Sequence, residues 1–152
     1  MILIGIGANL PSPAYATPLE ACRAALGALS EAGLGVRRRS RWYESAPVPA
    51  SDQPWYVNGV VAVVSTLTAP AVLDRLHRIE EDFGRLRGEA NAARTLDLDL
   101  LDFDGVIVTP PEGHALRLPH PRLHERAFVL LPLRDVAPNW RHPVFGKDVG
   151  AL

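Results

Sequence analysis

The sequence has little of what secreted, membrane-spanning or nucleic-acid-binding proteins need. Cys22 is the only cysteine among 152 residues, so no disulfide can form within the chain, and we expect a reducing, cytoplasmic setting. No stretch approaches the roughly 18 apolar residues of a membrane span. Residues 1–6 are too short an apolar run, with no basic residues before it, for a signal peptide. The net charge of −1 argues against a nucleic-acid-binding surface.

Lysine is nearly absent as well. Lys147 is the only lysine among the 16 basic residues, so the other 15 are arginines, whose planar guanidinium suits phosphate groups. Proline, in contrast, is abundant: 14 residues, concentrated in 8–18, 46–54 and 110–121, where we expect ordered loops. Hydrophobic residues make up 47% and charged residues 22% of the chain, which is typical of a globular protein. The length favours one domain over residues 1–152.

The hydrophobic pattern predicts an α+β domain. Short apolar or β-rich runs predict strands, and apolar residues at helical spacing, with caps such as Thr68 and Gly84, predict helices. The predicted strands are 2–6, 36–43, 56–66, 96–103 and a return strand 106–108, and the predicted helices are 19–29, 68–83 and about 125–131. The order strand-helix-strand-strand-helix-strand matches a ferredoxin-like (split βαβ) antiparallel sheet with helices packed on it and extra C-terminal elements.

Paired aspartates in the strand 96–103 are the strongest local signal for chemistry. Side chains alternate along a strand, so Leu96, Leu98 and Leu100 share one face, while Asp97 and Asp99 share the other. The two aspartate Cα atoms are then roughly 6.5–7 Å apart. Carboxylates at that spacing can hold hard cations of the kind that clamp a phosphoryl-transfer transition state. A merely solvated face is the alternative, whereas Asp102 and Asp104 are expected to be turn and solvent residues.

Basic side chains surround this strand in the sequence. Arg85, Arg87 and Arg94 precede it, and His120 and Arg126 follow it. A substrate with several phosphates needs such donors, because phosphoryl transfer depends mainly on positioning and charge neutralisation. Taken singly, each arginine is an ordinary surface residue; as a group around two aspartates they favour a phosphate site.

A second polar cluster, at the start of the strand 56–66, suits a flat ligand. Tyr56 and Asn58 share a strand face, offering an aromatic plane beside an amide that both donates and accepts hydrogen bonds. That pair fits a nitrogen-rich heterocycle, although a polar strand end would look the same. Gly5-Ile6-Gly7, in contrast, lacks the third glycine of a dinucleotide fingerprint.

Together these residues resemble the 6-hydroxymethyl-7,8-dihydropterin pyrophosphokinase family of folate synthesis. The likeness runs in order over nearly the whole chain, and its most specific part is the aspartate segment. The segments that carry it are 5–10, 42–47, 52–54, 56–58, 78–80, 94–99, 118–122 and 126–128. The family's fold is ferredoxin-like α+β, in agreement with the order of elements.

The resemblance implies a transfer of pyrophosphate from ATP to the hydroxymethyl oxygen of the pterin, with AMP leaving. Asp97 and Asp99 would bind two Mg²⁺ ions between the ATP phosphates, and with Arg85 and Arg94 they would form the catalytic set. The residues implied to bind ATP are Glu80 (near the adenosine), Arg85, Arg87, Arg94, Leu100, His120 and Arg126. We expect no nucleic-acid partner, no membrane and a monomer.

The resemblance also implies a pterin pocket. Its members here are Ser45, Ala46, Val48, Tyr56, Asn58 and Phe128, with Phe128 stacking on the ring. The chain departs from the family pattern at Ala90 and Asn91, where some members have arginine and tryptophan, and at Ala46, which replaces a common proline. Two other classes remain open from the residues alone: a non-catalytic ferredoxin-like module that binds a nucleotide or other small ligand, and an RNA-binding sheet.

Overall fold

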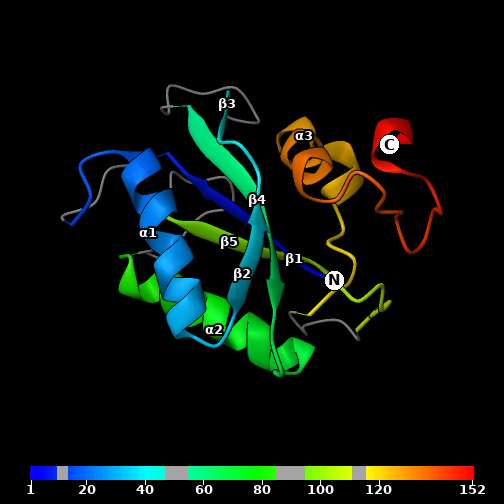
Figure 1. Ribbon diagram of the computed structural model, residues 1–152, viewed down its shortest axis with the longest axis horizontal. Helices are drawn as coiled ribbons and strands as arrows, with labels where there is room; N and C mark the ends of the chain where they lie inside the picture. The colour runs from blue at the N-terminus through cyan, green and yellow to red at the C-terminus, as the bar shows by residue number, and fades with distance from the viewer. Residues whose placement is uncertain (10–13, 47–54, 85–94, 111–115) are drawn as a thin grey trace.

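The computed structural model describes residues 1–9, 14–46, 55–84, 95–110 and 116–152. Its centre is an antiparallel sheet in the order β2-β4-β1-β5, in which the short β3 also pairs with β4 (Figure 1). The strands are β1 (Ile2–Ala8), β2 (Gly35–Arg39), β3 (Tyr43–Ser45), β4 (Tyr56–Val64) and β5 (Asp97–Phe103). The predicted α+β, ferredoxin-like class is therefore confirmed.

Helices lie on both faces of the sheet. The first face packs against α1 (Pro18–Glu31) and α2 (Ala69–Asp82), and α3 (Ala127–Val136) lies on the other side (Figure 1). Two 3₁₀ turns, η1 (Leu123–Glu125) and η2 (Val149–Ala151), accompany α3. None of the helices in the described parts of the chain has the length and apolar content needed to cross a lipid bilayer.

Local sequence explains where the two long helices begin and end. Thr17 caps α1 by accepting a hydrogen bond from the Glu20 amide, and Thr68 caps α2 by accepting one from the Ala71 amide. Each helix has a proline in its first turn, where the missing amide hydrogen costs nothing. Gly84 follows α2 with φ of +86°, a conformation that favours glycine and turns the chain out of the helix.

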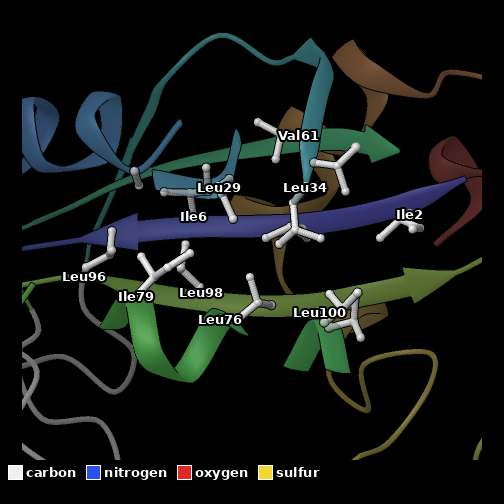
Figure 2. Packing of buried hydrophobic residues seen from close by; sticks show 14 of the residues in the cluster. Ile2, Ile6, Leu29, Leu34, Val61, Leu76, Ile79, Leu96, Leu98 and Leu100 are labelled. Atoms are coloured by element: carbon white, nitrogen blue, oxygen red, sulfur yellow. The ribbon is translucent and has the colours of Figure 1, made fainter. Parts of the chain in front are cut away.

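Alternation along the strands produces two separate cores. Leu96, Leu98 and Leu100 point to the face covered by α1 and α2, as the sequence predicts, and Figure 2 shows them packed with Leu76 and Ile79 of α2. Cys22 is fully buried in this core, where burial raises the pKa of its thiol to about 12. On the other face, side chains of α3 pack against the sheet in a second core, whose members include Leu3, Val60, Ala62, Leu101, Leu123, Val129, Leu133 and Val136.

The predicted strand 36–43 is two strands, not one. The Ser40 hydroxyl accepts a 2.9 Å hydrogen bond from the Val60 amide and donates to the Arg41 carbonyl at 2.6 Å, which replaces regular ladder pairing. Trp42 lies over Gly59, where a Cβ would be 2.6 Å from its ring. The chain thus bends after Arg39 and resumes pairing at Tyr43, a change that periodicity does not encode.

A bulge in β5 explains one wrong prediction, that Asp102 is exposed to solvent. Ile4 pairs with Leu100 but Leu3 pairs with Asp102, so Leu101 is an extra residue. The shift turns Asp102 towards the α3 side, where it is 2% exposed and accepts a 3.0 Å hydrogen bond from the Trp140 indole.

The predicted turn at Asp104 and Gly105 forms, with both residues at positive φ. The return strand 106–108 does not form: only Val108 makes an isolated bridge, to Leu118. The Asp104 amide and carboxylate bind the carbonyl and amino group of Met1, which continues the pairing of β5 with β1. The Leu101 carbonyl of β5 accepts a 2.9 Å hydrogen bond from the His120 amide instead of from a return strand.

Candidate active site

The open part of the α3-side sheet face carries the paired aspartates. Antiparallel pairing places Asp97 opposite Gly7, and Asn58 opposite Gly7 on its other side. Gly5 lies between Asp99 and Val60 in the same way. Directly paired residues point to the same face, so Asp97, Asp99 and Asn58 look out over a floor made by two glycines without side chains. α3 covers only part of this face, and the rest is accessible.

Two cavities meet at the aspartate pair. The larger, about 530 Å³, lies between this floor and the start of α3, and the smaller, about 270 Å³, lies between β5, α2 and residues 116–121. Asp97 and Asp99 line both cavities. The volume of the larger is in the range of small-molecule sites. A molecule in each cavity could therefore reach the same two carboxylates.

The larger cavity gathers the residues that the sequence assigns to a heterocycle. Tyr56 and Asn58 line one wall, Ser45 and Ala46 the end of β3, and Phe128 the roof. The Asn58 amide nitrogen donates a 2.7 Å hydrogen bond to the Ser45 hydroxyl, which fixes the orientation of its side chain. Val48 lies outside the described residues.

Arg126 stands between the two groups of predicted residues. It immediately precedes α3 and lines the larger cavity, where its guanidinium lies 5.4 Å from the centre of the Phe128 ring. At that distance the positive charge is attracted to the aromatic face. Phe128, which is predicted to stack on the pterin, is thus in contact with Arg126, which is predicted to bind phosphate.

The smaller cavity contains His120, held by its loop beside the aspartates. The His120 Nδ1 accepts a hydrogen bond from the Arg122 amide at 3.2 Å, and its Nε2 lies 3.9 Å from Asp99 Oδ1. Burial is the main cause that lowers the pKa of His120 to about 4, with the charges of Arg126 and Arg122 acting in the same direction and that of Asp97 against them. The ring is therefore neutral at pH 7, with its proton on Nε2, the nitrogen that faces the site.

Glu80 and Leu100 line the smaller cavity from buried positions. Glu80 is 2% exposed, and its Oε2 accepts a 2.9 Å hydrogen bond from the amide of Leu98, the residue between the two aspartates. Leu100 is 4% exposed, with its side chain in the first core. Arg85, Arg87 and Arg94, and the segment containing Ala90 and Asn91, lie outside the described residues.

Sequence reasoning missed several residues that line the cavities. Gly5 and Gly7 belong to a segment that carries the family resemblance, but they are not predicted to line the site, although glycines two apart in an apolar strand indicate a close approach to that face. Arg122 and Glu125 also line the larger cavity, and His77 and Arg117 the smaller one. Among these last four residues, only Arg122 belongs to a segment that carries the family resemblance.

Carboxylates on an open sheet face, between two cavities and beside a histidine and an arginine, define a class of site suited to transfer of a phosphorus-containing group between two small molecules. Comparison with known proteins makes the assignment specific. The family model described as 7,8-dihydro-6-hydroxymethylpterin-pyrophosphokinase (HPPK) matches residues 3–138. The chain belongs to this family.

Three bacterial relatives share this similarity, and each is named 2-amino-4-hydroxy-6-hydroxymethyldihydropteridine pyrophosphokinase. The protein of Synechocystis sp. is 37% identical over 148 residues, which cover 97% of this chain and 71% of the relative. That of Haemophilus influenzae is 38% identical over 135 residues, 88% of this chain and 79% of the relative. That of Pseudomonas aeruginosa is 40% identical over 145 residues, which cover 93% of this chain and 83% of the relative. The family resemblance found in the sequence is confirmed.

Proposed function

We propose that this chain transfers the pyrophosphoryl group of ATP to the hydroxymethyl oxygen of 6-hydroxymethyl-7,8-dihydropterin, a reaction of folate biosynthesis, at Asp97 and Asp99. The chain's family and its relatives are pyrophosphokinases of this kind. The observation that carries the placement is that both aspartates line both cavities. A donor nucleotide in one cavity and an acceptor in the other would meet at these two residues.

The aspartate pair suits Mg²⁺ by the chemistry of its donors. Mg²⁺ prefers hard oxygen ligands and is commonly held by one or two carboxylates, with water and substrate phosphates completing its shell. Within the described part of the chain, no three His, Cys, Asp or Glu side chains are placed to hold one metal ion. Two carboxylates open to both cavities leave the remaining positions to phosphate oxygens. Bound Mg²⁺, for which we propose two ions, would neutralise charge on the transferred group.

On the nucleotide side, we assign His120 and Arg126 to the phosphates. His120 Nδ1 accepts from the Arg122 amide and its Nε2 lies 3.9 Å from Asp99 Oδ1, so the Nε2–H is placed to donate to a phosphate oxygen beside the aspartates. Arg126 lines the larger cavity, and its charge acts on His120 in the smaller one. Arg85, Arg87 and Arg94 are proposed to add to this set, with Glu80 and Leu100 near the adenosine.

On the pterin side, we assign Asn58 and Tyr56 to the ring edge and Phe128 to its face. Asn58 is nearly buried, at 7% exposure, and its amide nitrogen is engaged by Ser45. A flat ring in the larger cavity would lie between β4 and the first turn of α3, with Ser45, Ala46 and Val48 at its end. The cavity's limited size and glycine floor favour a planar ligand over a branched one.

The chemical step requires little more than alignment. The hydroxymethyl oxygen of the pterin attacks the β-phosphorus of ATP, the new O–P bond forms, and the bond to the oxygen bridging the α-phosphate breaks. AMP leaves with that oxygen, and the hydroxyl proton passes to solvent. The proposed role of Asp97, Asp99 and the cationic groups is to hold the reacting oxygen in line with the bond that breaks.

The reaction is tested by incubating the protein with ATP, Mg²⁺ and the reduced pterin. We expect AMP and the pterin diphosphate to appear in equal amounts, and turnover to stop when a chelator removes Mg²⁺. Tight binding of both ligands without turnover would instead support the non-catalytic binding module and refute the proposed activity.

We further propose that the chain works as a cytoplasmic monomer with residues 1–152 as one domain. In support, β1, β3, β4, β5 and the start of α3 from a single chain supply the described walls of the larger cavity. Sedimentation at working concentration should give a mass near the 16.5 kDa of one chain. A dimeric mass would overturn this part of the proposal.

A further inference from the structure

Three side chains outside both cavities form a compact polar network. Asp135 near the end of α3 accepts hydrogen bonds from the Arg41 guanidinium at 3.0 and 3.2 Å, from the Arg41 amide at 3.2 Å, and from the Tyr43 hydroxyl at 2.7 Å. The guanidinium also donates to the Tyr43 hydroxyl at 3.0 Å. One carboxylate is therefore the meeting point of four hydrogen bonds that cross from the β3 segment to α3.

This network differs from an ordinary surface ion pair. Exposed pairs contribute little, because water screens them and two flexible side chains must be ordered. Here the Asp135 side chain is only 16% exposed, although Arg41 is 76% exposed, and the arginine binds with two nitrogens at once. Hydrogen bonds from Arg41 lower the pKa of Asp135 to about 2, and the hydrogen bond to Asp135 raises the pKa of Tyr43. The charges and the bridging proton thus persist throughout the neutral range.

The network lies at one end of two elements whose other ends line the larger cavity. β3 runs from Tyr43 to Ser45, so the pocket residues Ser45 and Ala46 are two and three positions beyond the network. On α3, Phe128 lies seven residues before Asp135, about 10 Å along the helix axis. β3 has only three paired residues, all with β4. The Tyr43 hydroxyl, at the first of these residues, ties this short strand to α3 through its hydrogen bond to Asp135.

We propose that Arg41, Tyr43 and Asp135 are positioning residues that set the separation of β3 from α3 and thereby hold the pterin cavity ready for its ligand. The inference rests on the proposed function of that cavity. A pocket that is competent in only a fraction of molecules binds its ligand more weakly by that same fraction. Loss of the network should therefore weaken pterin binding more than nucleotide binding, because Asp97, Asp99 and His120 lie outside β3 and α3, and only Arg126 of the described nucleotide groups adjoins α3.

The test compares Asp135→Asn and Tyr43→Phe with wild type in steady-state kinetics, with pterin and ATP varied separately. We expect KM for the pterin to rise about five- to tenfold, with KM for ATP and kcat within about twofold. Asp74→Asn is the matched control, because it removes an exposed pair with Arg78 (3.2 Å) on α2, far from the β3–α3 junction. This control should leave both KM values unchanged.

A double substitution distinguishes positioning from general damage. If Arg41 acts through Asp135, Arg41→Ala combined with Asp135→Asn should raise the pterin KM no further than Asp135→Asn alone. An unchanged pterin KM in Asp135→Asn, or an equal rise in both KM values, would overturn the inference. Calorimetry of pterin binding, with a non-hydrolysable ATP analogue and Mg²⁺ present, gives the same comparison without turnover. If the wild-type protein binds the pterin but does not turn it over, the proposed function is refuted. The positioning inference is then still decided by comparing the pterin affinities of the variants.

Discussion

Replacing Gly7 with alanine should damage the pterin cavity through a single contact. A Cβ at residue 7 would lie 3.0 Å from the Asn58 side-chain oxygen, closer than the 3.4 Å at which ordinary contact begins. Asn58 cannot easily move aside, because its amide nitrogen is hydrogen-bonded to Ser45 at 2.7 Å. The added methyl group therefore forces either a shift of the Asn58 amide by a few tenths of an ångström or loss of the bond to Ser45.

The expected cost follows from what Asn58 does in the cavity. If the displaced amide loses one well-oriented hydrogen bond to the pterin, binding weakens by about 1–2 kcal/mol, which corresponds to a roughly 5- to 30-fold higher dissociation constant. ATP binding should change much less, because Gly7 lines only the larger cavity. The effect should therefore appear as a selective rise in the KM for the pterin.

Gly5 provides the matched control on the same strand and the same face. Its added Cβ would meet only Leu101 side-chain atoms, at 3.6 Å or more, which is ordinary contact. Both added methyl groups enter the floor of the larger cavity, but only the one at residue 7 presses on Asn58. Steady-state kinetics with each substrate varied should therefore show a larger rise in the pterin KM for Gly7→Ala than for Gly5→Ala. Equal defects in the two variants, or a Gly7→Ala enzyme with normal pterin KM, would refute the reasoning from the Asn58 contact.

The remaining predictions concern charge and hydrogen bonding. Asp97→Ala and Asp99→Ala should each lower kcat by at least about 10²-fold with the fold retained, whereas Asp104→Asn in the exposed turn should leave kcat unchanged. Turnover is measured by AMP release, and near-normal turnover in the two alanine variants would rule out the metal assignment. Asn58→Ala should weaken pterin binding far more than ATP binding in calorimetry, and equal losses would contradict the pocket assignment. Because the folded pKa of Asp135 is about 2 against an ordinary 3.8, its stabilisation is present above about pH 4 and is lost as the pH falls towards 2. Asp135→Asn should therefore melt below wild type at pH 7 and alongside it near pH 2; a difference that persists at pH 2 would contradict the linkage.

Most of the helices and strands could be predicted from hydrophobic periodicity and helix-capping residues. The alternating leucines of β5 and the apolar stripe of α2 each specify a buried face, and Thr68 and Gly84 mark where α2 begins and ends. These signals depend only on residues close together in the chain, so they can be recognised in a single sequence without knowledge of the tertiary contacts. The aspartate pair could be predicted for the same reason, since residues two apart in a strand must share a face.

Features that depend on distant partners could not be predicted in this way. The break after Arg39 requires Ser40 to meet the Val60 amide, and the burial of Asp102 requires Trp140 to reach it. Residues 106–108 do not pair with β5, and the Leu101 carbonyl of β5 accepts a hydrogen bond from the His120 amide, 19 residues further on, instead. In each case the deciding contact joins positions many residues apart, which no local pattern reveals.

The extra residue in β5 has a bearing on which changes of length this chain can tolerate. Up to Leu100 the aspartates face the cavities and the leucines face α1 and α2, and after Leu101 the facing is reset so that Asp102 meets Trp140 while Phe103 returns to the first core. Removing Leu101 would keep these facings and lose only one side chain of the second core, whereas removing Leu98 would turn Asp97 into the first core and Leu96 out of it. A single-codon deletion in β5 should thus be tolerated far better at Leu101 than at Leu98.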